Sequence, residues 1–362
     1  MELQHFINEN LDNYSSLFKK YELKVMNYNQ LGLMMVKGKY NFDYDYEKNP
    51  WIRYCRGVVI NTVTNKVICI PPRKAIQKEN IYDFLNENEY NNDNISIQPL
   101  IDGTMINMFY HNNEWFICTR SNIGAKNSWD GKVPFHKMFK EINGDEWFSE
   151  LDIHSCYSFV LRHNKNRIIS PVETNEIYLI ERHMVFEDNI TKAELPFIVG
   201  ITNTYDIKTD NLMCYNDINL NYRFKGFTVK KHDGERINWI NPNYVHVGEL
   251  KMNYNHPFLN YIELRQKKKL TEYLNYFPEA RYLFDEYRNK LIKIKEDIYE
   301  SYVSIFIKKE NEIKNVNYSI RPLLYKLHGY YHKSGEKINR KIVSDYLYQL
   351  PCKKLLFIYN YY

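Results

Sequence analysis

Short apolar runs separated by polar, turn-forming stretches dominate the chain from residue 31 to about residue 247. Patterns of strand, polar turn and strand are typical of β-hairpins. The predicted strands are residues 58–60, 67–70, 105–110, 115–118, 158–161, 176–180, 224–230 and 236–240. Because short turns join neighbouring runs, the pattern predicts an antiparallel, hairpin-rich α+β domain.

A different periodicity begins after residue 255. Apolar residues recur there every three or four positions, at Leu283, Tyr287, Leu291, Ile294, Ile298, Tyr302 and Ile305. This spacing predicts a helix with one apolar stripe that faces a core. A second helix is predicted over residues 258–276, and Pro278 and Pro322 stand where further helices would begin. The C-terminal region is therefore predicted to be a bundle of three or four helices.

Composition and charge narrow the class of protein. The 362 residues are 44% hydrophobic and 26% charged, which excludes a disordered or collagen-like chain and suffices for two domains. The charge is uneven, because residues 251–362 carry 21 Lys and Arg against 12 Asp and Glu, whereas the whole chain has a formal charge of +5. One interpretation is a polyanionic partner, and the other is a solvated, Lys-rich helix surface.

The cysteines and the N-terminal residues bear on metal binding and on location. The six cysteines are Cys55, Cys69, Cys118, Cys156, Cys214 and Cys352. They show no zinc-ligand spacing, so no metal site is predicted. The first five residues, Met-Glu-Leu-Gln-His, lack the basic and apolar segments of a signal peptide, and no apolar run approaches the roughly 18 residues that a membrane span needs. We expect a cytoplasmic protein with free thiols and no membrane partner.

Five short motifs follow one another within residues 50–250. They are Cys-Arg-Gly-Val-Val at 55–59, Ile-Asp-Gly-Thr-Met-Ile at 101–106, Tyr-Ser-Phe-Val at 157–160, Asn-Arg-Ile-Ile at 166–169 and Lys-Gly-Phe-Thr-Val at 225–229. In this order they resemble the bacteriophage RNA ligase 1-like family of ATP-dependent RNA ligases and nucleotidyltransferases, and the RNA ligase-like proteins of large DNA viruses. The resemblance implies an antiparallel-sheet nucleotidyltransferase domain of ATP-grasp-like ligase fold over residues 1–252. A small, basic, all-helical domain over residues 253–362 would follow it.

The resemblance also implies a chemistry for which this chain lacks the groups. In the family, a lysine two positions before the motif aspartate attacks the α-phosphate of ATP, and here Leu100 stands two positions before Asp102. Arg162 and Lys225 replace the glutamates that hold ribose and metal, and a final pair of lysines is replaced as well, at Asn238 and Ile240. We therefore expect a catalytically degenerate protein without a metal site, which would use ATP and Mg²⁺ only if activity were retained. The residues expected to bind nucleotide or phosphate are Arg56, Asp102, Gly103, Arg162, Arg167 and Lys225.

Alternatives stay open for these residues. Lys74 and Lys78 lie upstream of the motif strand and are the candidates for a surrogate nucleophile. In the purely structural interpretation, Asp102 caps a turn, and the motif glycines serve turns or close approaches of the backbone. These glycines are Gly57, Gly103 and Gly226.

The basic C-terminal region contains one candidate RNA-binding surface. Lys267, Lys268 and Lys269, followed by Tyr273 and Tyr276, interleave cations and aromatic rings as surfaces that bind nucleic acid do. An ordinary solvated helix face fits the same pattern. In the family that the motifs resemble, appended helical domains help to select RNA.

Three functions are therefore open. The first is a ligase-like pseudoenzyme that binds RNA or nucleotides in RNA repair or processing. The second is an active ATP-dependent RNA ligase with a surrogate lysine, and the third is a structural or virion-associated scaffold. The partners implied are RNA and an active partner ligase or another viral protein. The expected location is the host cytoplasm if the protein is viral, with the virion as the alternative.

Overall fold

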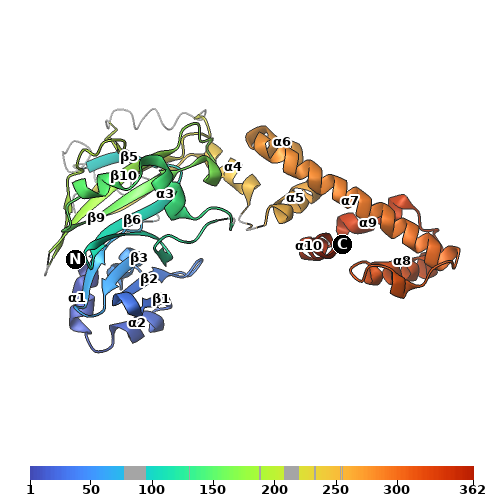
Figure 1. Cartoon of the computed structure of the whole chain (residues 1–362), viewed down its shortest axis with the longest axis horizontal. Helices are drawn as coiled ribbons and strands as arrows, with labels where there is room; N and C mark the ends of the chain where they lie inside the picture. Colours follow the sequence, from blue (N-terminus) through green and yellow to red (C-terminus); the bar gives the residue numbers. More distant parts are fainter. Residues whose placement is uncertain are drawn as a thin grey trace. The chain divides into compact units, whose positions relative to one another are not determined.

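The structure is a computed structural model that describes residues 1–76, 95–129, 131–186, 189–207, 220–231, 234–252, 254 and 256–362. The chain divides into two compact units, Met1–Val245 and His246–Tyr362 (Figure 1). The first unit contains the sheets, and the second is helical. Helix α4 (Pro242–Lys251) carries the chain from the first unit into the second.

A four-stranded antiparallel sheet is formed near the N-terminus of the first unit. Its order is β1 (Leu23–Tyr28), β2 (Leu33–Gly38), β3 (Arg56–Asn61) and β4 (Lys66–Cys69). The short helices α1 (Glu2–Glu9) and α2 (Tyr14–Lys20) pack on it. Leu3, Ile7 and Phe18 of these helices are fully buried against the strands. The amphipathic N-terminal helices therefore close the core on that side.

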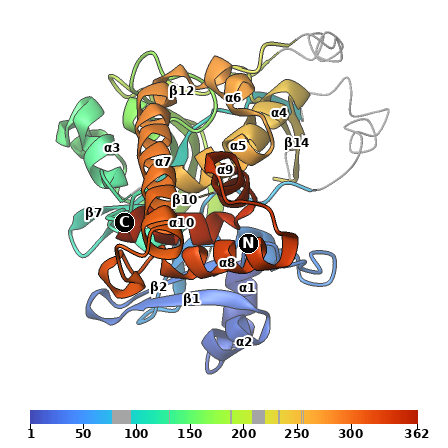
Figure 2. The same ribbon diagram turned by 90° about the vertical axis from the view of Figure 1, so that its right-hand side faces the viewer.

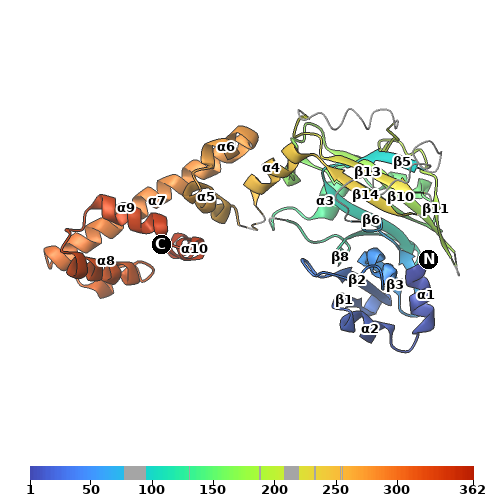
Figure 3. The ribbon, with the colours of Figure 1, turned by 180° about the vertical axis from the view of Figure 1, so that it is seen from behind.

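The second sheet is larger and has α3 (Phe135–Asn143) over one face (Figure 3). Its order is β11 (Ile190–Ala193), β10 (Glu176–Val185), β9 (Ser155–Arg162), β6 (Thr104–His111), β7 (Glu114–Thr119) and β8 (Asn122–Ile123), and β12 (Thr202–Asn203) pairs with β10. Strand residues alternate between the two faces. Ile106 and Met108 pack towards α3, whereas Phe109 belongs to the core of the four-stranded sheet.

A third sheet has the order β14 (Arg236–Ile240), β13 (Gly226–Lys231) and β5 (Ile95–Pro99). Its strands are antiparallel, and Phe227, Val229 and Ile237 form a small core of their own. Among the described pairs, only β10 with β12 forms a parallel ladder. The expected fold class, α+β with antiparallel sheets followed by an all-helical region, is confirmed.

The hairpins predicted from the hydrophobic pattern are present in the first unit. Strand β3 pairs with β4, β6 with β7, and β13 with β14, each pair being antiparallel. Residues 232 and 233 of the last predicted turn lie outside the described residues, as does Cys214. The hairpin prediction succeeded because short polar turns and apolar runs are both local features of the sequence.

The second unit is built around the long helix α7 (Arg281–Tyr302), which faces the viewer in Figure 2. The other helices are α5 (Pro257–Gln266), α6 (Leu270–Tyr276), α8 (Arg321–Ser334), α9 (Arg340–Gln349) and α10 (Cys352–Tyr361). The predicted apolar stripe is largely confirmed, because Tyr287, Leu291, Ile294, Ile298 and Tyr302 are all buried. Pro322 lies in the first turn of α8, where a helix start was expected.

Two expectations for this unit were wrong. The helix expected over residues 258–276 is broken into α5 and α6, because Lys268 adopts a left-handed conformation with φ of 58°. The described part of the unit also contains more helices than the three or four expected. Residues 340–361 form two of them, whose buried positions are few and are separated by Pro351.

Candidate functional site

Residues from all three sheets line a cavity of about 500 Å³ in the first unit. Met105, Val160 and Ile180 come from strands β6, β9 and β10 of the larger sheet. Arg56 is the first residue of β3 in the four-stranded sheet. Asn238 belongs to the three-stranded sheet. Sequence positions almost two hundred residues apart therefore meet at one place.

Many of the residues singled out from the motifs line this cavity. They are Arg56, Leu100, Gly103, Lys225, Asn238 and Ile240. Leu100 is held in place because its amide donates a hydrogen bond to the carbonyl oxygen of Gly226 at 2.8 Å. An alkyl side chain thus lines the cavity at the position where the resemblance implies an amine, and it has no lone pair with which to attack phosphorus.

Arg56, Arg120 and Lys225 give the cavity its positive charge. None of the three has an ion pair with an acidic side chain among the described residues. Lys225 Nζ lies 3.4 Å from the carbonyl oxygen of Ile101. Burial lowers the pKa of Lys225, the nearby Asp102 raises it in part, and Arg56 lowers it further. Burial, together with the neighbouring Arg120 and Arg236, also lowers the pKa of Arg56. Such crowding of like charges favours a bound anion.

A buried ion cluster adjoins this cavity, because its two cations, Lys230 and Arg236, line the cavity. Glu181 is 1% exposed, and its carboxylate accepts bonds from Arg236 at 2.6 and 3.2 Å and pairs with Lys230 at 2.8 Å. The two cations hold the pKa of Glu181 well below its usual range, against the opposing effect of burial. A register shift after Leu179 lets both Ile180 and Glu181 face the cavity side of β10.

The Asp102 carboxylate is occupied by hydrogen bonds within the protein. Its carboxylate accepts hydrogen bonds from the backbone amides of Ile169 and Ser170, at 3.0 and 2.8 Å, and from the hydroxyl of Tyr244. Burial and the neighbouring Asp102 raise the pKa of Tyr244, so this hydroxyl stays protonated as a donor. The arrangement ties the motif loop to the segment around Ile169 and to the start of α4.

The motif glycines lie where the backbones approach closely. A Cβ atom at Gly103 would lie 2.4 Å from the carbonyl oxygen of Leu161, and one at Gly226 would lie 2.1 Å from that of Trp239. Gly57 has a φ of 99° and lies against the backbone of Arg120. These contacts require glycine for steric reasons alone, whatever binds in the cavity.

Two of the expected phosphate ligands point elsewhere. Arg162 donates to the carbonyl oxygen of Pro171 at 2.9 Å and lies 3.6 Å from the Glu176 carboxylate. The guanidinium of Arg167 turns back to the carbonyl oxygen of Ile169 at 2.8 Å. Neither residue is among those that line the cavity, so the structure does not bring them together with Arg56 and Lys225.

A basic groove of about 910 Å³ adjoins the cavity and shares Arg56, Arg120 and Trp129 with it. Its cations are Lys24, Lys37, Lys39, Arg56, Lys74 and Arg120, and its aromatic residues are Tyr40, Phe42, Tyr44, Tyr46 and Trp129. Lys74, one proposed surrogate nucleophile, lies in this groove and donates to the Tyr46 hydroxyl at 2.8 Å. Lys78, the other surrogate, lies outside the described residues.

The three consecutive lysines of the second unit form the turn between α5 and α6. Lys267 pairs with Glu263 at 2.6 Å, whereas Lys268 and Lys269 are exposed. Arg265 and Leu270 flank this turn and line a pocket described below. The lysines are therefore available at the surface, as either interpretation of the sequence requires.

Sequence reasoning missed Glu181 and Trp129. A single acid in the strand sequence Ile-Tyr-Leu-Ile-Glu-Arg was the available signal for Glu181, since an ionised residue inside a buried strand needs a partner. Trp129 lies in a polar loop, where no feature of the sequence indicates that its side chain would line a cavity. The buried carboxylate matters because it removes Lys230 and Arg236 from the cations available to a ligand.

The described residues of the cavity do not fit a Mg²⁺ site. None of its described lining residues is an aspartate or glutamate, whereas hard cations require oxygen ligands. No group of three or more His, Cys, Asp or Glu residues that could hold a metal occurs in the described parts of either unit. Likewise, no helix in those described parts is long and apolar enough to cross a membrane.

The chain is similar in sequence to a protein of Autographa californica nuclear polyhedrosis virus that is named as a bifunctional polynucleotide kinase/RNA ligase. The two are 25% identical over an alignment of 199 residues, and the match covers 50% of this chain. The match spans only 28% of the length of the viral protein. No protein-family model matches the chain.

Solved structures of ligases share limited similarity with the chain. An archaeal ATP-dependent RNA ligase gives a TM-score of 0.42 at 10% identity, over 80% of this chain and 79% of that one. A chain named as an ATP-dependent DNA ligase from Aquifex aeolicus gives 0.39 at 13% identity, over 82% and 76%. An RNA ligase mutant from Naegleria gruberi gives 0.32 at 10% identity, over 48% and 57%. The resemblance to RNA ligases that the motifs carry is confirmed by the sequence match to the viral protein of that name.

Proposed function

We propose that this chain is a catalytically degenerate, RNA ligase-like protein that binds the phosphate groups of a nucleotide or of RNA in the cavity. The observation that carries the proposal is the cluster of Arg56, Arg120 and Lys225 beside Leu100, with no lining carboxylate among the described residues. A cationic cavity without a nucleophile or metal ligands favours binding of an anion over transfer of one.

The charge of the second unit supports RNA as the larger partner. Its excess of Lys and Arg belongs to residues 251–362, and Lys268 and Lys269 are exposed there. Phosphate contacts of this kind give affinity that falls as salt rises and shows little preference for sequence. RNA repair or processing is the context that the viral relative's name supports.

Titration of tripolyphosphate into the full chain without divalent cations tests the cavity. We expect binding that Arg120→Gln weakens about ten-fold or more, because a charge-assisted hydrogen bond contributes roughly 1.5–3 kcal/mol. Lys20→Gln is the matched control, since this exposed lysine of α2 removes the same charge outside the cavity. Equal affinities for the two variants would refute the cavity as the binding site.

A denaturing intact-mass spectrum after incubation with Mg²⁺ and ATP tests the loss of catalysis. We expect no covalent adduct, because Leu100 cannot form a phosphoramidate. An added AMP that survives denaturation would overturn the proposal, and peptide mapping would then identify the modified residue.

Nucleotidyl transfer through Lys225 is the second candidate function, and one observation favours it. The Lys225 amine lies in the cavity that Leu100 also lines, 3.4 Å from the carbonyl oxygen of Ile101, and its pKa is lowered mainly by burial. Attack by the neutral amine on the α-phosphate would form a P–N bond, expel pyrophosphate and release a proton to water. An adduct that maps to Lys225 and disappears in Lys225→Met would establish this function in place of the first.

A further inference from the structure

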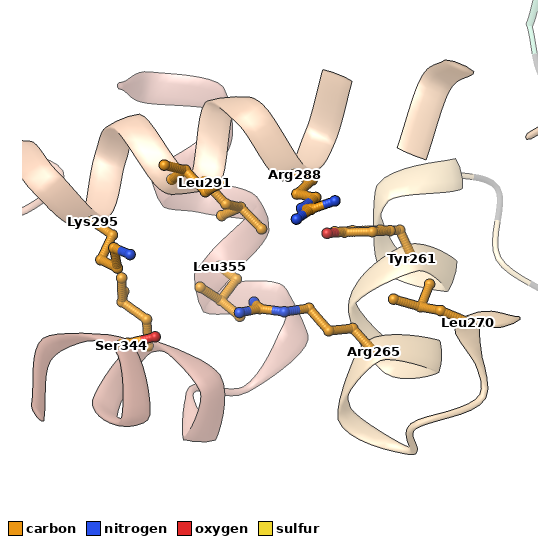
Figure 4. Close-up of a pocket in the computed structure, with 10 residues that line it drawn as sticks. Tyr261, Arg265, Leu270, Arg288, Leu291, Lys295, Ser344 and Leu355 are labelled. Carbon is orange, nitrogen blue, oxygen red and sulfur yellow. The ribbon is translucent and has the colours of Figure 1, made fainter. Parts of the chain in front are cut away.

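The second unit contains a pocket of about 320 Å³ that none of the motifs indicated (Figure 4). Helices α5, α6, α7, α9 and α10 line it. The lining residues are Tyr261, Arg265, Leu270, Arg288, Leu291, Ile292, Lys295, Ser344, Leu347 and Leu355. All of them belong to the compact unit His246–Tyr362, so the pocket is complete within one unit.

Three cations from two helices surround this pocket. Figure 4 shows Arg265 reaching in from α5 towards Leu355, while Arg288 of α7 points to the hydroxyl of Tyr261. Lys295 lies seven residues, or two turns, after Arg288 and therefore on the same face of α7. The hydroxyls of Tyr261 and Ser344 add hydrogen-bond donors to the same space.

These cations are poorly neutralised by the protein. No acidic side chain is among the described residues that line the pocket. Lys295 lies 3.6 Å from Glu296, but that carboxylate is also held by Arg340 at 2.7 Å. Burial raises the pKa of Tyr261, whereas the positive charges of Arg265 and Arg288 lower it. Both guanidiniums therefore act on the same hydroxyl. Asp285 has the opposite effect and raises the pKa of Tyr261.

Leucines line the pocket beside these cations. Leu291, Leu347 and Leu355 are buried, and Leu270, the first residue of α6, also lines the pocket. The volume falls at the lower end of the roughly 300–1,000 Å³ typical of sites for small ligands. A pocket that combines guanidiniums with apolar side chains suits a ligand with one strongly anionic end and one weakly polar body.

We infer that this pocket binds an organic phosphate of nucleotide size, with the phosphate on Arg265, Arg288 and Lys295 and the body of the ligand against the leucines. Guanidinium groups match phosphate geometry by paired hydrogen bonds, and a dianionic phosphate monoester uses more of the three positive charges than a carboxylate does. The phosphate comes either from the end of an RNA strand or from a free nucleoside monophosphate. The inference does not depend on the cavity of the first unit.

Calorimetric titration of the full chain with AMP, and separately with a short oligoribonucleotide carrying either a 5′-phosphate or a 5′-hydroxyl, tests the inference. The titrations use an Arg120→Gln background, so that binding in the first unit's cavity is weakened throughout. In this background we expect Arg288→Gln to weaken AMP binding about ten-fold or more. Arg288 is exposed, so its replacement leaves the core of the unit intact.

Lys293→Gln is the matched control. This lysine is exposed on the same helix, does not line the pocket and carries the same charge. We expect it to change the affinity less than about two-fold, because a remote surface charge is screened by salt. Arg265→Gln gives a second variant, and the helical circular dichroism signal verifies that each one is folded.

The outcomes separate the ligand sources and the two proposals. A preference for the 5′-phosphate strand that Arg288→Gln removes supports the end of an RNA chain, and binding of AMP alone supports a free nucleotide. Absence of binding by every probe, or equal losses in Arg288→Gln and Lys293→Gln, overturns the inference. Tripolyphosphate binding that responds to Arg120 but not to Arg288 would leave the proposed function standing without this pocket.

Discussion

Replacing Glu181 with glutamine removes the charge that holds Lys230 and Arg236 in the cavity wall. The three contacts of its carboxylate, at 2.6, 2.8 and 3.2 Å, are all made to cations, and the side chain is 1% exposed. Glutamine keeps the shape but leaves two buried cations without an anion. Removal of one partner from a buried ion pair costs about 3–5 kcal/mol in the free energy of unfolding.

Tryptophan fluorescence during urea unfolding measures this loss in the correct unit. All five tryptophans, at positions 51, 115, 129, 147 and 239, lie within residues 1–245. Glu173→Gln is the control, because Glu173 pairs with Arg223 at 3.0 Å while both side chains are exposed. Exposed pairs contribute about 0–1 kcal/mol, so the control should unfold almost like the wild type.

The pH dependence provides a second readout of the same variant. The folded-state pKa of Glu181 is depressed well below the unfolded value of about 4.3. Its contribution to stability is therefore complete above that unfolded value and is lost as the pH falls through the folded pKa. Below about pH 4.3 the variant should lose stability less steeply than the wild type, by up to about 1.4 kcal/mol per pH unit. A loss below about 1 kcal/mol at neutral pH, with an unchanged acid slope, would refute this account.

Three further changes probe two motif residues and Tyr244, the tyrosine that donates to Asp102. Gly103→Ala should lower the free energy of unfolding by about 1–3 kcal/mol in the same urea assay, because its Cβ would meet the Leu161 carbonyl oxygen; a neutral result would exclude the steric role. Tyr244→Phe should cost about 1–3 kcal/mol, since Asp102 loses a buried donor, and an unaltered midpoint would contradict this. Lys225→Met should weaken tripolyphosphate binding several-fold by calorimetry, and equal affinity would remove Lys225 from the site.

Much of the fold was accessible from the sequence because its signals are local. The pairing of β3 with β4 and of β6 with β7 follows from apolar runs on either side of polar turns. The prediction missed the break between α5 and α6, although residues 265–269 contain no apolar side chain, because the apolar spacing resumes at Leu270 and Tyr273. Periodicity shows which face is buried and does not show where one backbone dihedral reverses its sign.

The site was accessible only in part, and β10 shows why. Strict alternation from the buried Leu179 would place Ile180 on the cavity side and Glu181 on the side of α3. The register shift between Leu179 and Glu181 puts both on the cavity side, where the carboxylate meets Arg236. A bulge is decided by pairing with β9, so the strand's own sequence does not reveal it.

The wall shared by the cavity and the basic groove has a thermodynamic consequence. Arg56 and Arg120 face both spaces, and Trp129 lines both as well. An anion held in one space neutralises guanidinium charge that an anion in the other would also use. The coupling free energy between the two occupants is therefore unfavourable, and it is the same whichever of them binds first. An anion bound in the cavity therefore lowers the affinity of the groove for a second anion, and the reverse holds as well. This electrostatic effect requires no movement of the backbone.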